Sequence, residues 1–291
     1  MSVKVGNHIV GADHPVYFIA DIASNHNGDL SHAKELIHAC AESRVDAVRM
    51  QNFNAETIVS DFGFKNLDGV KTHQSAWKNS VFNSYKAASI PFEWTLELKE
   101  LTEALGMDYF TSPYSLELTK AVEPYISAFK LGSGDITWHE QIKLMSSFHK
   151  PLLIATGASN IDEVKRAMRV ALEKSKDIIL MQCNTNYTAN KKENISVTEE
   201  RFSNINLKVL ETFSKLWPEV PFPLRLAEVP IRTCCLGLYR LCPGPCHSCH
   251  DPFLCHRAYH RRFLYRSAEG FCSGAAPSPA RRRAEACSGW P

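Results

Sequence analysis

The feature that most constrains the fold is a regular alternation of short apolar runs with longer amphipathic stretches between residues 16 and 217. Six runs have the length and nearly continuous apolar character of parallel strands that are buried on both faces. The stretches between them show apolar positions at helical spacing and charged outer faces, which is typical of helices that cover a sheet. The chain is therefore predicted to be an α/β protein. The predicted strands cover residues 16–23, 47–53, 108–114, 128–134, 151–157 and 177–183.

Polar side chains gather at the end of each predicted strand, and this decides between two α/β architectures. A TIM-type (β/α)8 barrel brings all strand ends to one mouth, whereas a doubly wound open sheet spreads them along an edge. We therefore predict a TIM-type (β/α)8 barrel that is incomplete, with six recognisable β/α units and an irregular C-terminal tail. The doubly wound sheet is the alternative. The long polar segment at 54–92 is predicted to be an elaborated loop at the mouth.

The composition changes abruptly near residue 222. All lysines lie at or before Lys215, whereas most arginines lie from Arg225 onward, and of the ten cysteines only Cys40 and Cys183 precede residue 234. We therefore divide the chain into a barrel-like domain at 1–222 and a Cys/Arg/Pro-rich tail at 223–291. The working hypothesis for the tail is an out-of-frame or alternative reading of the coding region. A zinc module built from the Cys/His run at 242–256 is the alternative.

Charge and hydropathy exclude several classes of partner. The formal net charge of +2 creates no strong field, so neither nucleic acid nor an anionic membrane surface is indicated. No apolar segment reaches the roughly 18 to 20 residues that span a bilayer. The N-terminal residues also lack the pattern of a signal peptide. A cytoplasmic location is therefore expected.

The run FKLGSGD at 129–135 places a cation, two glycines, a hydroxyl and an acid at the end of a buried strand. Lys130 and Ser133, with backbone that can approach closely at the glycines, suit an oxyanion such as phosphate. Arg49 is a cation within another buried strand, where it requires an anion. Two cations directed at one mouth predict an anionic substrate. The alternatives are a lysine that extends to the surface and a structural ion pair between Arg49 and Asp21.

Six ordered segments together resemble the sialic acid synthase (N-acetylneuraminate synthase) family over about residues 16–222. They are IADIASNHNGDLSHAKELI, DAVRMQNFNAETIVSD, DYFTSPYS, FKLGSGDITW, LLIATGAS and MQCNTNYTA. The resemblance implies a barrel enzyme of carbohydrate biosynthesis, a transferase that condenses phosphoenolpyruvate with the aldehyde of an N-acylated amino sugar such as N-acetylmannosamine. The products implied are a sialic acid and phosphate. It further implies a divalent cation, Mn or Mg, and a homodimer.

The resemblance also implies roles for individual residues. Asp21 and Asp135 fall where the family has catalytic carboxylates that handle the sugar and water. The positions that fall where the family binds its two substrates are Arg49, Gln51, Ser112, Lys130, Ser133, Asn184, Thr185 and Tyr187.

The resemblance ends near residue 222. The family's two histidine motifs that hold the metal do not appear in the sequence, so no ligands for the divalent cation are found, and the C-terminal antifreeze-like domain is missing too. A barrel without its last two strands is expected to be poorly stable and to have little or no activity. Two alternatives follow: a non-catalytic remnant that still binds phosphoenolpyruvate, or a class I aldolase that uses Lys130 as a Schiff-base nucleophile.

Overall fold

The computed structural model describes residues 2–66, 77, 79–157, 159–183 and 206–220, and the backbone of 226–230. The chain divides into two units, Met1–Cys235 and Leu236–Pro291, and every described residue lies in the first. The predicted site residues Asn184, Thr185 and Tyr187 lie outside the described residues, as does the tail from residue 231.

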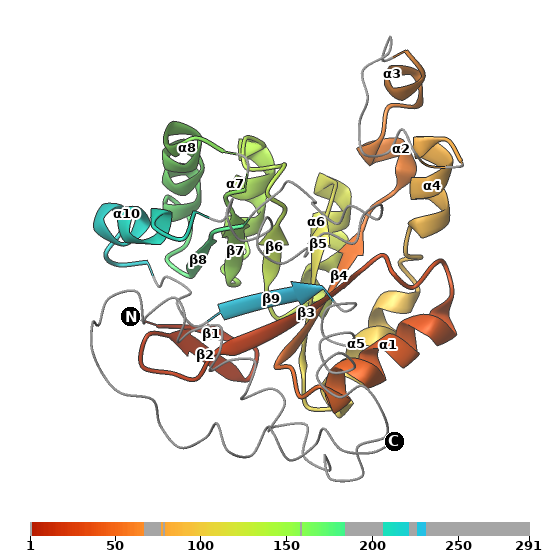
Figure 1. Cartoon of the computed structure of the whole chain (residues 1–291), viewed down its shortest axis with the longest axis horizontal. Coiled ribbons are helices and arrows are strands. Elements are labelled where there is room, and N and C mark those ends of the chain that lie inside the picture. The colour runs from red at the N-terminus through yellow and green to blue at the C-terminus, as the bar shows by residue number, and fades with distance from the viewer. Residues whose placement is uncertain are drawn as a thin grey trace, which may run out of the picture. The chain divides into compact units, whose positions relative to one another are not determined.

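A curled parallel sheet of seven strands forms the centre of the described unit, in the order β8-β7-β6-β5-β4-β3-β9 (Figure 1). The first six strands in chain order are the six that the sequence predicts, and each pairs with its successor, as in a (β/α)8 barrel. The predicted incomplete TIM-type barrel is therefore confirmed. The strands are β3 (Tyr17–Ala23), β4 (Ala47–Asn52), β5 (Asp108–Pro113), β6 (Phe129–Leu131), β7 (Leu152–Ala155), β8 (Ile178–Met181) and β9 (Leu226–Pro230).

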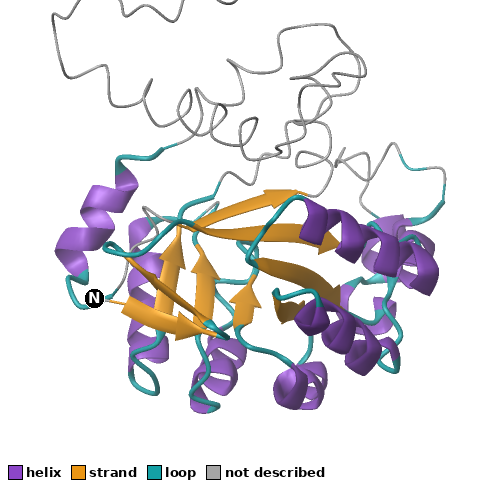
Figure 2. Cartoon of the chain, turned by 90° about the horizontal axis from the view of Figure 1, so that it is seen from below, coloured by secondary structure: helices purple, strands orange, loops and turns teal. Residues whose placement is uncertain are grey.

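Helices cover the outer face of the curled sheet (Figure 2). Three of them begin at a residue whose side chain caps the helix: Asp29 accepts a hydrogen bond from the His32 N–H, Ser115 accepts from the Leu118 N–H, and Asn160 forms a capping box with Glu163. The covering helices are α1 (Leu30–Glu42), α5 (Trp94–Ala104), α6 (Leu116–Val122), α7 (His139–Ser147), α8 (Ile161–Leu172) and α10 (Val209–Leu216), and a short 3₁₀ turn, η2 (Glu123–Tyr125), follows α6.

In its described residues, the long segment between β4 and α5 contains three further helices, α2 (Ala55–Ile58), α3 (Asp61–Lys65) and α4 (Val81–Ala88). They extend from the C-terminal end of β4 (Figure 1). The prediction of an elaborated loop at this end of the sheet is confirmed.

Two elements of the structure differ from the sequence-based expectation. An antiparallel hairpin of β1 (Ser2–Val5) and β2 (His8–Gly11) precedes the barrel strands. Within the segment expected to be irregular, β9 runs parallel to β3, with Tyr17 opposite Leu226 and Asp21 opposite Pro230. β9 thus lies on the side of β3 where the last strand of a closed barrel pairs with the first.

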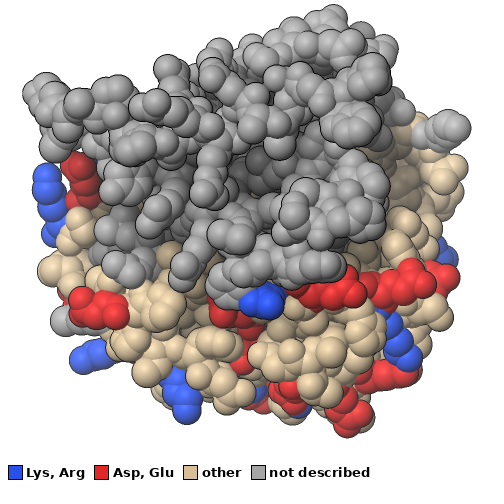
Figure 3. Space-filling model, turned by 60° about the horizontal axis from the view of Figure 1, so that its bottom comes forward, with Lys and Arg blue, Asp and Glu red and all other residues tan. Residues whose placement is uncertain are grey.

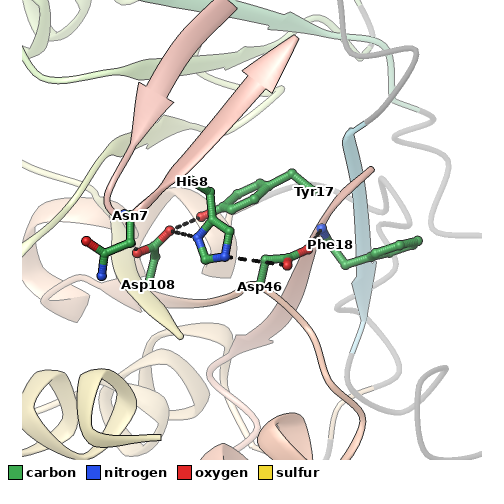
Figure 4. Close-up of polar contacts among 6 residues, drawn as sticks. All are labelled: Asn7, His8, Tyr17, Phe18, Asp46 and Asp108. Carbon is green, nitrogen blue, oxygen red and sulfur yellow. Dashed lines mark hydrogen bonds and ion pairs between the residues drawn. The ribbon is translucent and has the colours of Figure 1, made fainter. Parts of the chain in front are cut away.

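The hairpin turn packs against the N-terminal ends of the barrel strands through the carboxylate of Asp108 (Figure 4). This carboxylate accepts hydrogen bonds from the Asn7 N–H at 3.1 Å and the Tyr17 hydroxyl at 2.9 Å, and it contacts His8 Nδ1 at 2.8 Å. Asp46 accepts from the Phe18 N–H at 2.6 Å. Burial and the neighbouring carboxylates raise the pKa of Tyr17, so its hydroxyl keeps its proton. We call this set of contacts the lower polar cluster.

Basic and acidic side chains are interspersed on the described surface that Figure 3 shows. None of the helices in the described part of the chain is long and apolar enough to cross a membrane.

Candidate functional site

The strand register places the predicted cations and hydroxyls on one face of the sheet. In the parallel ladder Asp21 lies opposite Arg49, and Gln51 lies opposite Ser112. Arg49 and Gln51 are two residues apart on β4, so both project to the same side. Thr111 lies opposite Phe129, and the next positions along these two strands are Ser112 and Lys130. The predicted residues of four strands therefore meet above the C-terminal edge of the sheet.

Arg49 connects two of these residues directly. Its Nη2 donates to Asp21 Oδ2, and its Nη1 donates to Ser112 Oγ at 3.0 Å. The Arg49 side chain is only 5% exposed, whereas the Asp21 side chain is 20% exposed. The structural ion pair left open by the sequence is thus present. A guanidinium has five N–H donors in a planar fork, so it can hold a carboxylate and a hydroxyl and still face a ligand.

A local irregularity in β3 comes directly after Asp21. The pairing of β3 with β4 shifts between Asp21 and Ala23, which is a β-bulge, and Ala23 has φ = 52°. Bulges of this kind re-aim side chains and often lie next to binding sites. Asp21 and Arg49 are therefore the last regular pair of the ladder before the shift.

Gln51 lies in a second group of contacts. Its Nε2 donates to the Tyr114 hydroxyl at 3.1 Å, and its Oε1 accepts from Ser24 Oγ at 3.4 Å. Tyr114 follows β5 directly and is not among the site residues predicted from the sequence. The only sequence signal is an aromatic residue after the strand-ending Ser-Pro pair, a pattern equally typical of core packing.

Lys130 and Asp135 interact electrostatically at the end of β6. Lys130 is 7% exposed. Burial raises the pKa of the Asp135 carboxyl, and attraction to Lys130 opposes this rise without cancelling it. A partly desolvated carboxyl beside a buried cation is a candidate for proton exchange with a substrate. Ser133 lies between the two in the chain and is half-buried.

His26 lies in the loop after β3 and is fully buried. Its Nδ1 accepts from the Gly28 N–H at 3.1 Å, and its ring meets the Trp94 ring edge-on at 5.9 Å. Burial lowers the pKa of His26, and nearby His32 adds to this effect. The imidazole is therefore neutral, and it supports the loop from inside.

No group of three or more His, Cys, Asp or Glu side chains that could hold a metal ion occurs among the described residues. Asp21 and Asp135 are the carboxylates that the site offers. The described side chains therefore do not make the ligand set that a catalytic divalent cation needs.

Comparisons with known proteins show which family the chain matches. The model of the NeuB family matches residues 36–221. N,N'-diacetyllegionaminic acid synthase of Legionella pneumophila is 27% identical over 216 residues, which is 70% of this chain and 55% of that protein. Human N-acetylneuraminate-9-phosphate synthase is 25% identical over 214 residues, 73% of this chain and 55% of that one. An uncharacterised protein of Methanocaldococcus jannaschii is 27% identical over 218 residues, covering 74% and 56%. The chain thus spans about half the length of these relatives.

Solved structures agree on the fold. The sialic acid synthetase of Leptospira borgpetersenii matches with a TM-score of 0.66 at 18% identity, covering 98% of this chain and 95% of that one. The spore coat polysaccharide biosynthesis protein SpsE of Bacillus subtilis matches with a TM-score of 0.64 at 22% identity, covering 95% and 75%. At this level of identity the likeness shows the architecture alone. Because the family model covers more than half of the sequence, the chain belongs to the NeuB family.

Proposed function

We propose that this chain binds phosphoenolpyruvate at the C-terminal edge of its sheet. We also propose that this site is suited to condensing phosphoenolpyruvate with the aldehyde of an N-acylated amino sugar. The observation that carries the proposal is the convergence of Arg49, Ser112 and Lys130 on one face of three adjacent strands. Two buried cations and a hydroxyl suit a small ligand that carries a phosphate and a carboxylate. The curated relatives named as synthases of sialic and legionaminic acids support the same class of reaction.

The residues suggest how the reaction would proceed. Arg49 and Lys130 hold the anionic groups of phosphoenolpyruvate, and Asp21 fixes the orientation of the guanidinium through the bond to Nη2. The methylene carbon of phosphoenolpyruvate forms a bond to the aldehyde carbon, whose oxygen takes up a proton. Water adds to the former enol carbon, the bond between this carbon and the bridging oxygen breaks, and phosphate leaves with that oxygen and the electron pair of the bond, which yields a 2-keto acid. Of the two protons that the water gives up, one goes to the leaving phosphate and one restores the acid that protonated the aldehyde oxygen. Asp135, with its raised pKa, is the described group best suited to supply that proton.

A divalent cation, Mn or Mg, remains a proposal for this family member. If bound, it would polarise the aldehyde. No step above depends on it, because the described residues lack a suitable ligand set. A homodimer and a cytoplasmic location are likewise proposed on the resemblance to the family.

Thermal unfolding of the full chain with and without phosphoenolpyruvate tests the binding step. At one hundred times Kd a ligand stabilises the folded state by about 2.7 kcal/mol, and the unfolding midpoint should rise by roughly 5 to 10 °C. Lys130→Met should abolish most of this rise. Lys143→Met, which removes a cation from an exposed position on α7, should not. The absence of any rise in the unsubstituted chain would refute the proposal.

A phosphate-release assay with phosphoenolpyruvate, N-acetylmannosamine and manganese tests the condensation step. Release that depends on both substrates supports a synthase. Binding without release supports the narrower function of a phosphoenolpyruvate-binding protein. The observation that favours this alternative is that the described residues include no group of three or more His, Cys, Asp or Glu that could hold a metal ion.

A further inference from the structure

The ring of His26 holds together the loop between β3 and α1, residues 24–29, which we call the β3–α1 loop. At the start of this loop, the backbone N–H and the side-chain amide of Asn25 both donate to the Ile22 carbonyl, at 3.0 and 2.7 Å. At its far side, the Gly28 N–H donates to His26 Nδ1 at 3.1 Å. The imidazole therefore closes the loop from inside.

This role requires the neutral form of the ring. His26 Nδ1 accepts a hydrogen bond, so it carries no hydrogen, and the neutral ring has its proton on Nε2. Nε2 is buried and has no hydrogen-bond partner among the described residues. A second proton would lie on Nδ1 and point at the Gly28 N–H. A positively charged ring thus gains no acceptor at either nitrogen, and the loop loses one hydrogen bond.

The surroundings of the ring also disfavour a positive charge. His26 is fully buried, and burial lowers its pKa, with repulsion from His32 on α1 as the second cause. Asp29, the nearest carboxylate in the sequence, accepts from the His32 N–H, and Trp94 on α5 has no ionisable group. The ring therefore takes up a proton below about pH 6.5 more readily when the loop is open than when it is closed.

The closed loop has little slack to replace a lost hydrogen bond. Asn27 and Gly28 both have positive φ, 54° and 74°, and this conformation is unfavourable for a residue with a side chain. A Cβ at Gly28 would lie 2.9 Å from the Ala87 carbonyl oxygen, so the loop packs closely on the last turn of α4. The loop depends on its hydrogen bonds to keep this shape.

The β3–α1 loop is connected to the mouth at two points. Ser24 Oγ donates to Gln51 Oε1 at 3.4 Å. Ile22, whose carbonyl holds the start of the loop, follows Asp21, and Asp21 accepts from Arg49 Nη2. A change in the loop therefore reaches two residues that are predicted to contact substrates, Arg49 and Gln51.

We propose that His26 is a positioning residue whose neutral imidazole keeps the β3–α1 loop closed beside the mouth, and that protonation of this ring opens the loop and opposes ligand binding. The second part of this inference rests on the function proposed above. The mouth binds its anionic ligand with the loop closed, so the ligand and the proton on His26 compete for opposite states of the same segment.

Hydrogen exchange of the full chain, read by mass spectrometry of its peptides, tests the role of the ring without any ligand. The protection of residues 24–29 is compared at pH 7.5 and 5.5 after correction for the intrinsic pH dependence of exchange. One pH unit below the value of about 6.5 of an exposed imidazole, protonation of the open loop can weaken its closure up to about tenfold. We expect the protection to fall about 3- to 10-fold in this loop and by less than about twofold in β5.

Two histidine substitutions provide the matched comparison. His26→Asn removes the titrating ring but keeps a side-chain oxygen that can accept from the Gly28 N–H, as in an Asx turn. Its loop protection should change by less than about twofold between the two pH values. His38→Asn removes an exposed imidazole from α1 and should keep the fall of the unsubstituted chain.

Phosphoenolpyruvate tests the connection to the mouth. A ligand that binds only the closed loop, added at one hundred times its Kd, lowers the population of the open loop about hundredfold. At pH 7.5 we therefore expect the protection of residues 24–29 to rise at least about tenfold in the unsubstituted chain and in His26→Asn.

The outcomes separate this inference from the function on which it rests. Loop protection that does not depend on pH in the unsubstituted chain, or an equal fall in His26→Asn, would overturn the role of the ring. If His26→Asn does not fold, the fall at residues 24–29 relative to β5 in the unsubstituted chain decides this point. If phosphoenolpyruvate binds but leaves the loop protection unchanged, the connection to the mouth is wrong. If phosphoenolpyruvate does not bind at all, the proposed function is wrong, and the pH comparison still decides the role of the ring.

Discussion

Removal of the Asp108 carboxylate should destabilise the fold strongly, because this group joins the hairpin to the barrel. Asp108 is 3% exposed and Tyr17 is 2% exposed, so water cannot replace the lost contacts. In Asp108→Ala the Tyr17 hydroxyl and the Asn7 N–H lose their acceptor. A buried donor without an acceptor, such as the Tyr17 hydroxyl, loses about 1 to 3 kcal/mol. Asn7 is exposed, so its N–H adds less, and we expect a total loss of about 2 to 4 kcal/mol in the free energy of unfolding.

A double-mutant cycle isolates the contact between the two side chains. Tyr17→Phe removes one donor and leaves Asp108 with its contacts to Asn7 and His8, so we expect a loss of about 1 to 2 kcal/mol. In the Asp108→Ala background the same change removes a buried hydroxyl that has already lost its acceptor, so it should be neutral or should restore about 1 to 2 kcal/mol. The coupling energy should therefore be about 1 to 4 kcal/mol.

Urea unfolding of the full chain, followed by far-ultraviolet circular dichroism, measures these differences. If Asp108→Ala does not fold, the effect of Tyr17→Phe alone still tests the contact. Tyr109→Phe is the matched control, since it deletes a buried hydroxyl that has no described partner, and its stability should equal or slightly exceed that of the unsubstituted chain. Strictly additive losses in the cycle, or a Tyr17→Phe variant as stable as Tyr109→Phe, would refute the reasoning.

Three further predictions follow from the same structure. Gly6→Ala should be far more destabilising in thermal unfolding than Gly106→Ala. Both glycines have positive φ, but a Cβ at Gly6 would lie 2.0 Å from Asp108 Oδ1, whereas nothing lies within 4 Å of one at Gly106. Equal losses in the two variants would contradict this expectation. Asp135→Asn should be more stable than the unsubstituted chain at neutral pH, because the raised pKa of Asp135 means that its ionised form is unfavourable in the folded state. This difference in stability should shrink as the pH falls through the raised pKa toward the unfolded value of about 3.9. A difference that does not change with pH would contradict the prediction. His26→Asn keeps an acceptor for the Gly28 N–H. It should lose less stability than the unsubstituted chain on acidification below about pH 6.5, because the lowered pKa of His26 means that the unfolded state takes up the proton before the folded state does. Parallel profiles of stability against pH from pH 7 to 5 would contradict this prediction.

The barrel strands could be predicted from the sequence because burial on both faces leaves an unbroken apolar signature. Arg49 and Lys130 were recognisable for the same reason, since a cation inside such a run needs an explanation. Their common face follows from the two-residue period of a strand once the register is known, but a single sequence does not give the register.

Other parts of the structure depend on contacts distant in the chain. The hairpin strands have only four residues each, and their polar turn is fixed by Asp108, about one hundred residues away. β9 contains a glutamate and ends in proline, which is atypical of a buried strand, yet it pairs with β3. Tyr114 looks like a core aromatic in sequence, and only the contact with Gln51 shows that its hydroxyl faces the polar mouth.

The two polar ends of the sheet resemble each other in composition but differ in what their charges contact. The lower polar cluster contains a histidine, a carboxylate and a tyrosine within hydrogen-bond distance, which is the composition of many catalytic sites. However, the Asp108 carboxylate there is occupied by three donors from the protein itself, and it lies at the N-terminal end of the strands, where conserved polar groups in barrels serve stability. At the opposite end, Arg49 on β4 and Lys130 on β6, with β5 between them, project toward the side where the strands end and the long β4–α5 segment begins. A barrel separates these tasks because each strand has only one C-terminal end: residues there can approach a ligand from several directions, whereas residues at the other end are covered by the hairpin. The same types of side chain therefore stabilise the fold at one end and are available for chemistry at the other.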